Sequence, residues 1–114
     1  MDIKNITFVI TTYKSEDTIY NCLNSLPKEV NKIILENSNS NELKIDLEKK
    51  YENLQCYLMS ENLGYGKANN IGIHKSKTDY VFILNPDAKL LKDTLVDLFK
   101  ALINEDFSIA APLD

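Results

Sequence analysis

The sequence predicts a doubly wound α/β fold, in which helices cover both faces of a mostly parallel sheet. Strand-like and helix-like segments alternate along the 114 residues, and such units form parallel strands joined by right-handed crossovers. The composition, 44% hydrophobic and 26% charged, is ordinary for a globular protein. We expect residues 1–114 to form a single domain, because this length supports one core.

The strands and helices are predicted from the spacing of apolar residues. The β-branched and apolar runs read as strands are Ile6–Thr12, Lys32–Leu35, Gln55–Met59, Tyr80–Leu84 and Phe107–Ala111. The apolar positions of the intervening helices are Ile19, Cys22, Leu23 and Leu26; Leu43, Leu47, Tyr51 and Leu54; Ala68, Ile71 and Gly72; and Leu91, Leu95, Leu98, Phe99 and Leu102. The third of these helices runs from Gly66 to about Ser76.

Capping residues mark the ends of the first two helices. Ser15 is the expected N-cap of the first helix, which Pro27 ends. Either Asn39 or Ser40 is expected to cap the second helix.

Charge and cysteine content exclude several classes of protein. The net charge is −4 and the lysines are scattered, so the chain lacks the clustered cations that nucleic-acid binding requires. Cys22 and Cys56 have neither CxxC spacing nor a partner histidine, and we expect buried reduced thiols. No signal peptide or membrane-spanning run is present in the sequence, which favours a cytoplasmic location, including the inner face of the membrane.

The tripeptide Asn85-Pro86-Asp87 directly follows the strand predicted at Tyr80–Leu84. Proline has no N–H to donate to a sheet, so the strand must end there and leave Asn85 and Asp87 in a turn. Ligands of open α/β sheets bind outside these carboxyl ends, and paired side-chain oxygens suit Mg²⁺ or Mn²⁺. The alternative is a turn that serves only to end the strand.

The other strands of the sheet also lead into polar or aromatic loops, and these open at the same edge. They are Thr11–Tyr13, Glu36–Asn39 and Glu61–Gly66. These loops provide an aromatic ring that can stack on a base, amides that can bond to the edge of the base, and a glycine turn at the start of a helix. This combination suits a nucleotide that carries a diphosphate. Because Asp87 would repel a diphosphate oxygen about 4 Å away by several kcal/mol at a dielectric of about 20, a divalent cation is required.

Two familiar nucleotide motifs fail in this sequence. The run Gly64–Asn69 begins like G-x-G-x-x-G but has asparagine in place of the third glycine, and it follows the third strand rather than the first. Ala68 follows Gly66-Lys67 where a P-loop needs serine or threonine. A signalling receiver would need an acidic pair after the first strand, where Thr11 and Thr12 stand instead.

Taken together, the loops resemble those of family 2 glycosyltransferases with the GT-A, Rossmann-like fold. The resemblance covers roughly residues 5–114, and the segments that carry it are Ile10–Tyr13, Leu35–Ser38, Glu61–Gly66, Asn69–Gly72 and Asn85–Asp87. The resemblance implies an enzyme that binds a nucleotide-diphosphate sugar, with UDP or dTDP as nucleotide, together with Mg²⁺ or Mn²⁺. It implies transfer, with inversion, to a saccharide or lipid-linked acceptor in cell-surface polysaccharide synthesis.

The resemblance also assigns roles to individual residues. Thr11 and Tyr13 match positions that hold the ribose and stack the base, and Asn37 matches the position that reads the pyrimidine edge. Asp87 matches the last residue of a DxD-type motif, the metal ligand, in which Asn85 replaces the first acidic residue and is expected to bind the nucleotide. This Asn-Pro-Asp variant resembles rhamnosyltransferases, which use a deoxythymidine-diphosphate sugar.

Three further residues join the nucleotide-binding set, each with a structural alternative. Glu36 stands where the family usually has aspartate, and its extra methylene could carry the carboxylate past the base. The structural alternative for Asn62 is that it serves only to form a turn. For Lys67 the alternative is that it is a surface lysine at the start of a helix and contacts no ligand. For Tyr13 the alternative is packing on the first helix, and for Asn37 it is membership of a helix cap.

The family's catalytic base lies in the acceptor-binding half, which we expect beyond Asp114, so no catalytic residue is assigned within this chain. A non-catalytic nucleotide-binding or interaction module of the same fold is the alternative function. His74, among lysines and a serine, is expected to be a surface residue. If no other part of the protein covers Ile109 and Leu113, we expect the sheet edge near them to pair with another chain. This predicts self-association into a homo-oligomer.

Overall fold

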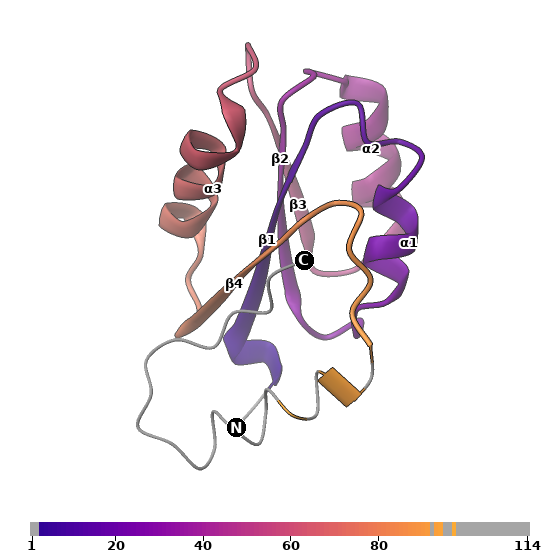
Figure 1. Ribbon diagram of the computed structural model, residues 1–114, viewed down its shortest axis with the longest axis vertical. Helices are drawn as coiled ribbons and strands as arrows, with labels where there is room; N and C mark the ends of the chain where they lie inside the picture. Colours follow the sequence, from indigo (N-terminus) through magenta and orange to yellow (C-terminus); the bar gives the residue numbers. More distant parts are fainter. Residues whose placement is uncertain (1–2, 92, 95–96, 98–114) are drawn as a thin grey trace.

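The computed structural model describes residues 3–91, 93–94 and 97. After a short 3-10 turn, η1 (Ile3–Asn5), strands and helices alternate (Figure 1). They are β1 (Ile6–Thr12), α1 (Ile19–Asn24), β2 (Asn31–Glu36), α2 (Asn41–Lys50), β3 (Leu54–Leu58), α3 (Gly64–Lys75) and β4 (Tyr80–Leu84). The helix predicted over 91–102 lies mostly outside the described residues, and the strand Phe107–Ala111 with Ile109 and Leu113 lies wholly outside them.

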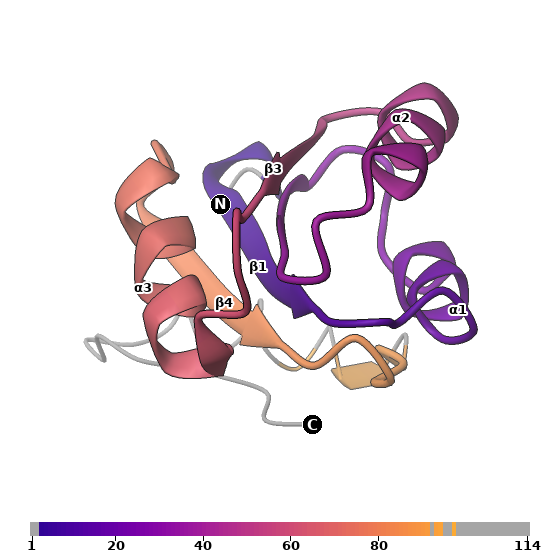
Figure 2. The same cartoon turned by 90° about the horizontal axis from the view of Figure 1, so that it is seen from above.

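The four strands form one parallel sheet in the order β3-β2-β1-β4. The register places Ile10 of β1 opposite Ile34 of β2 and Leu84 of β4. Helices α1 and α2 cover one face and α3 covers the other (Figure 2). The predicted doubly wound parallel sheet is therefore confirmed for the described residues.

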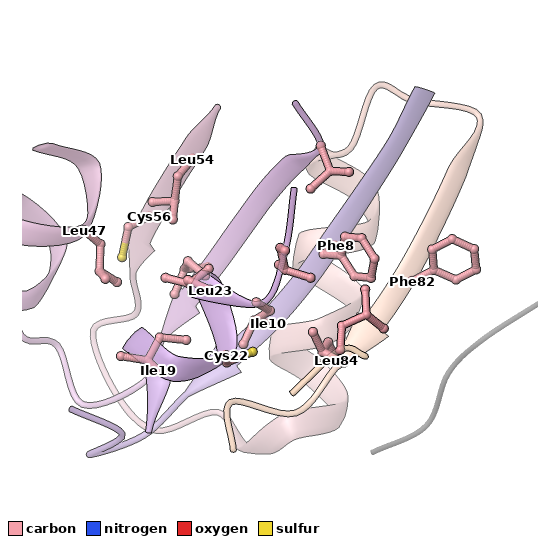
Figure 3. Close-up of a cluster of buried hydrophobic side chains, with 14 of the residues drawn as sticks. Phe8, Ile10, Ile19, Cys22, Leu23, Leu47, Leu54, Cys56, Phe82 and Leu84 are labelled. Carbon is pink, nitrogen blue, oxygen red and sulfur yellow. The ribbon is translucent and has the colours of Figure 1, made fainter. Parts of the chain in front are cut away.

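The core has two layers because the central strand is covered on both sides. All seven residues of β1 are buried, as expected for a strand of a parallel sheet with helices on both faces. On the side of α1 and α2, the cluster includes Phe8, Ile10, Leu23, Leu47 and Phe82 (Figure 3). On the side of α3, a smaller cluster is built from Val9, Ile33, Leu35 and Ala68.

Both cysteines are buried and free, as predicted. His74 is exposed on α3, also as predicted. Among the helices of the described residues, none combines the length and apolarity needed to cross a membrane.

The helix boundaries correct three details of the sequence prediction. Ser15 does not cap α1 through its side chain, because its hydroxyl accepts the N–H of Tyr13 and the helix begins only at Ile19. Leu54 belongs to β3 rather than to the face of α2, and α3 begins at Gly64, two residues before the predicted start. Ser40 is the N-cap of α2, with its hydroxyl accepting the N–H of Leu43 at 3.2 Å.

Candidate functional site

The candidate site lies at the carboxyl edge of the sheet, where the order of the strands reverses. From β1 the chain moves outward to β2 and β3, and it then returns to β4 on the other side of β1. Such a switch point is where open α/β sheets bind ligands. The residues predicted to bind a nucleotide and metal all follow β1, β2, β3 or β4 at this edge or stand at their last positions.

Tyr13 is presented to solvent immediately after β1. Its side chain is 41% exposed, and its backbone N–H donates to the hydroxyl of Ser15 at 3.0 Å. Lys14 follows with a left-handed φ of 51°, which costs energy for a residue other than glycine and turns the chain away from the strand. The ammonium of Lys14 lies 5.4 Å from the centroid of the tyrosine ring. The exposed ring is available for stacking rather than buried against α1.

Thr11, in contrast, is buried in the described structure. Its hydroxyl donates to Oδ1 of Asn69 on α3 at 2.5 Å, which fixes the orientation of the Asn69 amide. Asn69 lies in one of the segments that carry the family resemblance, but no role was predicted for it. A polar residue at the second turn of α3 was a signal, because the first turns of this helix lie beside the carboxyl edge.

Glu36, the last residue of β2, has a fully buried carboxylate. One oxygen accepts the hydroxyl of Thr12 at 3.0 Å, and Ser38 donates its hydroxyl to both oxygens at 2.7 and 2.9 Å. The backbone N–H groups of Ser38 and Ser40 donate at 3.3 and 2.6 Å. The carboxylate therefore organises the loop after β2, and the structure places it inside that loop rather than at the open edge.

Asn37 connects the loop after β2 to the loop before α3. Its Oδ1 accepts the N–H of Leu63 and its Nδ2 donates to the carbonyl of Gly64, both at 3.4 Å. The side chain is only 3% exposed, and its backbone N–H donates to the carbonyl of Thr12 at 2.8 Å. The Asn37 side chain thus directs one acceptor and one donor at the loop over 61–64. Both hydrogen bonds are longer than is usual for N–H···O bonds in proteins.

The loop before α3 is shaped by a glycine in the left-handed region. Gly64 has a φ of 80°, a conformation that other residues rarely adopt, and its N–H donates to Oδ1 of Asn62 at 3.0 Å. Asn62 is exposed and forms this turn, while Lys67 is exposed in the first turn of α3. Helix α3 therefore begins at the carboxyl edge of the sheet, with Lys67 in its first turn and the positive end of its dipole beside the candidate site.

Asp87 is exposed just beyond β4, and Asn85 is half-buried. The carbonyl of Asn85 accepts the N–H of Ala88 at 3.0 Å, which closes a turn with Pro86 at its second position. Pro86 is buried, so the turn directs its apolar residue inward and its carboxylate outward. Among the described residues, no hydrogen bond or ion pair engages the Asp87 carboxylate, and no cluster of three acidic, histidine or cysteine side chains forms a closed metal site.

A groove of about 880 Å³ lies elsewhere, near the amino ends of β2 and β3. None of the predicted site residues lines it, whereas five lysines do: Lys32, Lys49, Lys50, Lys75 and Lys77. Lys49, Lys50 and Lys75 stand in the last turns of α2 and α3, where cations complement the helix dipole. The helix dipoles thus account for three of the five lysines, and we place the candidate site at the carboxyl edge, where the predicted residues lie.

Comparison with known proteins identifies the family. The model of glycosyl transferase family 2 matches residues 7–113, nearly the whole chain. The chain belongs to glycosyltransferase family 2.

Two curated relatives of this family 2 chain are glycosyltransferases. The low-salt glycan biosynthesis hexosyltransferase Agl10 of Haloferax volcanii is 26% identical over 114 residues, which cover 96% of this chain and 36% of that protein. The poly(ribitol-phosphate) beta-glucosyltransferase of Bacillus spizizenii is 33% identical over 101 residues, covering 80% of this chain and 16% of that protein. The chain thus spans about a third or less of the length of these relatives.

Solved structures confirm the GT-A-like fold of this family 2 chain. The crystal structure of S. aureus TarS 1–349 superposes with a TM-score of 0.71 at 26% identity, covering 83% of this chain and 31% of that one. A crystal structure of TarS 1–349 in complex with UDP gives the same TM-score and identity. The family and the fold implied by the sequence resemblance are therefore confirmed, whereas the rhamnosyltransferase variant is matched by neither relative's name.

Proposed function

We propose that this chain is the donor-binding part of a glycosyltransferase for cell-surface glycan synthesis, which takes a hexose from a UDP-sugar or, as the alternative, a deoxyhexose from a dTDP-sugar. The observation that carries the proposal is the convergence of Tyr13, Asn37, the start of α3 and Asp87 at the switch point of the sheet. Family membership and the UDP complex of TarS support it. The acceptor is a saccharide or a lipid-linked glycan.

Asn37 and Tyr13 are the proposed contacts of the nucleobase. A uracil or thymine edge carries an N–H donor beside a carbonyl acceptor, and the Asn37 amide offers the complementary pair. Leu63 N–H and the Gly64 carbonyl now occupy these two groups at 3.4 Å. Base binding at Asn37 therefore requires the loop over 61–64 to shift, and the exposed Tyr13 ring supplies a stacking surface beside it.

Thr11 and Glu36 act on the site indirectly in this proposal. Both are buried and fully engaged, Thr11 with Asn69 and Glu36 with Thr12, Ser38 and Ser40. We assign them the task of fixing Asn69 and the loop that carries Asn37. Asn62 shapes the turn before α3, and Lys67 at the helix start is placed for a phosphate oxygen.

The residues at the turn after β4 fit a divalent cation that takes its other ligands from the diphosphate and water. Asp87 offers an exposed carboxylate without a hydrogen-bond partner among the described residues, and Asn85 offers an amide oxygen two residues before it. Mg²⁺ commonly binds through one or two protein oxygens and substrate phosphates. Such an ion, when bound, would neutralise the charge of the departing nucleoside diphosphate.

Transfer itself requires groups that we do not assign to this chain. The base that deprotonates the acceptor hydroxyl is proposed to lie in the acceptor-binding half of the whole protein, and displacement is proposed to invert the sugar carbon. The chain alone should therefore bind donor nucleotide without transferring sugar.

Isothermal titration calorimetry of the 114-residue chain with UDP, dTDP and GDP tests the proposal, with MnCl₂ or with EDTA. We expect UDP to bind with Mn²⁺ and to lose at least tenfold in affinity in EDTA, about 1.4 kcal/mol. GDP should bind more weakly, because a purine edge does not match Asn37. A folded sample that gives no heat with millimolar UDP and Mn²⁺ would contradict the proposed function, and preference for dTDP over UDP would favour the deoxyhexose donor.

A further inference from the structure

The segment after β4 is attached to α1 at both of its ends. At the start, the thiol of Cys22 donates to the carbonyl of Asn85 over 3.6 Å. At the far end, the N–H of Leu90 donates to the hydroxyl of Ser25 at 2.9 Å. The Ser25 hydroxyl in turn donates to the carbonyl of Cys22 at 2.6 Å, so the two attachments share the end of one helix.

Between these attachments two side chains, those of Asp87 and Lys89, are exposed, and Asp87 carries the only carboxylate. Pro86 and Leu90 are buried, and Ala88 packs against the core cluster. Asp87 is exposed, and no hydrogen bond joins its side chain to a described residue. The position of its carboxylate is therefore set by the backbone of the segment alone.

We infer that Cys22 and Ser25 are positioning residues that hold the Asn85–Asp87 turn in the geometry needed to bind the cation and diphosphate. This inference rests on the proposed function. It assigns no ligand contact to either residue, since both act through the backbone of the segment that carries Asp87.

The chemistry of the two groups suits this task. The Cys22 thiol is fully buried and directed at the Asn85 carbonyl, to which it donates. The carbonyl of Asn85 also accepts the N–H of Ala88, and its two lone pairs are thereby used to fix both the turn and its attachment. A ligand group held by a rigid backbone binds a metal more tightly than one that must be ordered on binding.

A packing role alone is the alternative for Cys22, which lies in the core beside Ile10 and Leu84 (Figure 3). Ser25 separates the two explanations better, because it is only half-buried and its hydroxyl makes the attachment. Ser25→Ala removes the attachment of Leu90 with little change in volume, and Ser25→Thr keeps the hydroxyl. Ser76→Ala is the matched control, because the Ser76 hydroxyl is also half-buried and accepts a backbone N–H, that of Thr78, at the opposite end of the sheet.

The experiment measures UDP affinity with Mn²⁺ and with EDTA for the 114-residue chain and these variants, well below each melting temperature. Broadening of the Asp87 amide resonance by Mn²⁺ and hydrogen exchange of the Leu90 amide are recorded in parallel. Ser25→Ala should weaken Mn²⁺-dependent binding at least fivefold, leave binding in EDTA within twofold, and speed Leu90 exchange. Ser25→Thr should restore all three readouts, and Ser76→Ala should change none of them.

Two outcomes would overturn the inference, and they are distinguishable. If wild type and Ser25→Ala bind UDP with Mn²⁺ equally well, the positioning role fails while the proposed function stands. If wild type binds neither Mn²⁺ nor UDP, the proposed function fails and the positioning role fails with it.

Discussion

The Glu36 carboxylate is a buried charge whose partners all come from one short stretch of chain and the end of β1. Ser38 donates its hydroxyl and its backbone N–H to it, Ser40 donates its backbone N–H, and Thr12 donates its hydroxyl from the neighbouring strand. A buried carboxylate is stable only when it is hydrogen-bonded in this way. The loop that carries Asn37 therefore depends on a carboxylate that is buried inside it.

Removing that charge should destabilise the protein. Glu36→Ala removes the acceptor of one buried donor, Thr12, and of the half-buried donors of Ser38 and Ser40, and we expect a loss of about 2–4 kcal/mol in the free energy of unfolding. Glu36→Gln keeps one acceptor oxygen and should lose less. Urea denaturation followed by circular dichroism measures both, with the exposed Glu42→Ala as a control expected to stay within about 1 kcal/mol. A Glu36→Ala variant as stable as wild type would show that the loop does not need the carboxylate.

The sequence predicted which polar residues lie at the site better than it predicted what each one contacts. Asn85 and Asp87 were correctly placed past the end of β4, because proline allows few other positions. The pairing of Thr11 with Asn69, 58 residues later, was not predictable, since it depends on how α3 crosses the sheet. The structural partners of Glu36 were missed for a related reason, because serines after a strand also fit a simple helix cap.

Helix α3 lies close to the sheet because one residue facing it has no side chain. A Cβ added at Gly72 would lie 2.5 Å from Cγ1 of Val9 and 2.7 Å from Cδ2 of Leu35. A Cβ added at Gly66, in the first turn of the same helix, would meet nothing within 4 Å. A substitution at Gly72 therefore tests the packing of α3 on the sheet, whereas a substitution at Gly66 tests helix propensity without a change in packing.

Alanine at these two positions should have opposite effects. Gly72→Ala forces α3 away from Val9 and Leu35, and we expect a loss of about 1–3 kcal/mol in stability. Gly66→Ala should gain about 0.5–1 kcal/mol, because alanine favours the helix. Thermal and urea unfolding measure both. Equal stabilisation by the two substitutions would mean that α3 can shift without cost and does not fix the position of Asn69.

The strands were predicted more accurately than the helix ends. The observed bounds of β1 and β4 coincide with the apolar runs Ile6–Thr12 and Tyr80–Leu84, because strands buried on both faces leave a continuous signal. Helix α1 starts later than expected, since the Ser15 hydroxyl bonds to Tyr13 while the Ser15 carbonyl accepts the N–H groups of Thr18 and Ile19. Whether Ser15 forms a local turn or caps the helix depends on the backbone geometry, and the residue types alone do not determine that geometry.

In the whole molecule, the order of the strands explains why separate loops form one site. Since β1 lies between β2 and β4, the loops that carry Tyr13, Asn37 and Asp87 come from three neighbouring strands. Alternation of strands and helices predicted the parallel sheet and its shared edge, whereas the loop carrying Leu63 and Gly64 was not expected to occupy Asn37. Among the residues at this edge, Asp87 is the one to which we assign the metal, so cation-dependent binding by the whole molecule should depend on its carboxylate.

Mn²⁺-dependent UDP binding by Asp87→Asn tests this dependence most directly. The substitution keeps the size and turn propensity of the side chain and removes its charge. The matched control is Asp79→Asn, which removes the same charge just before the other end of β4, where Asn5 bonds to the Asp79 side chain. We predict that Asp87→Asn loses at least tenfold in Mn²⁺-dependent affinity, about 1.4 kcal/mol, with an unchanged or higher melting temperature without ligand, while Asp79→Asn binds like wild type. Equal Mn²⁺-dependent binding by wild type and Asp87→Asn would contradict the assignment of Asp87 as the metal ligand, and with it the central claim.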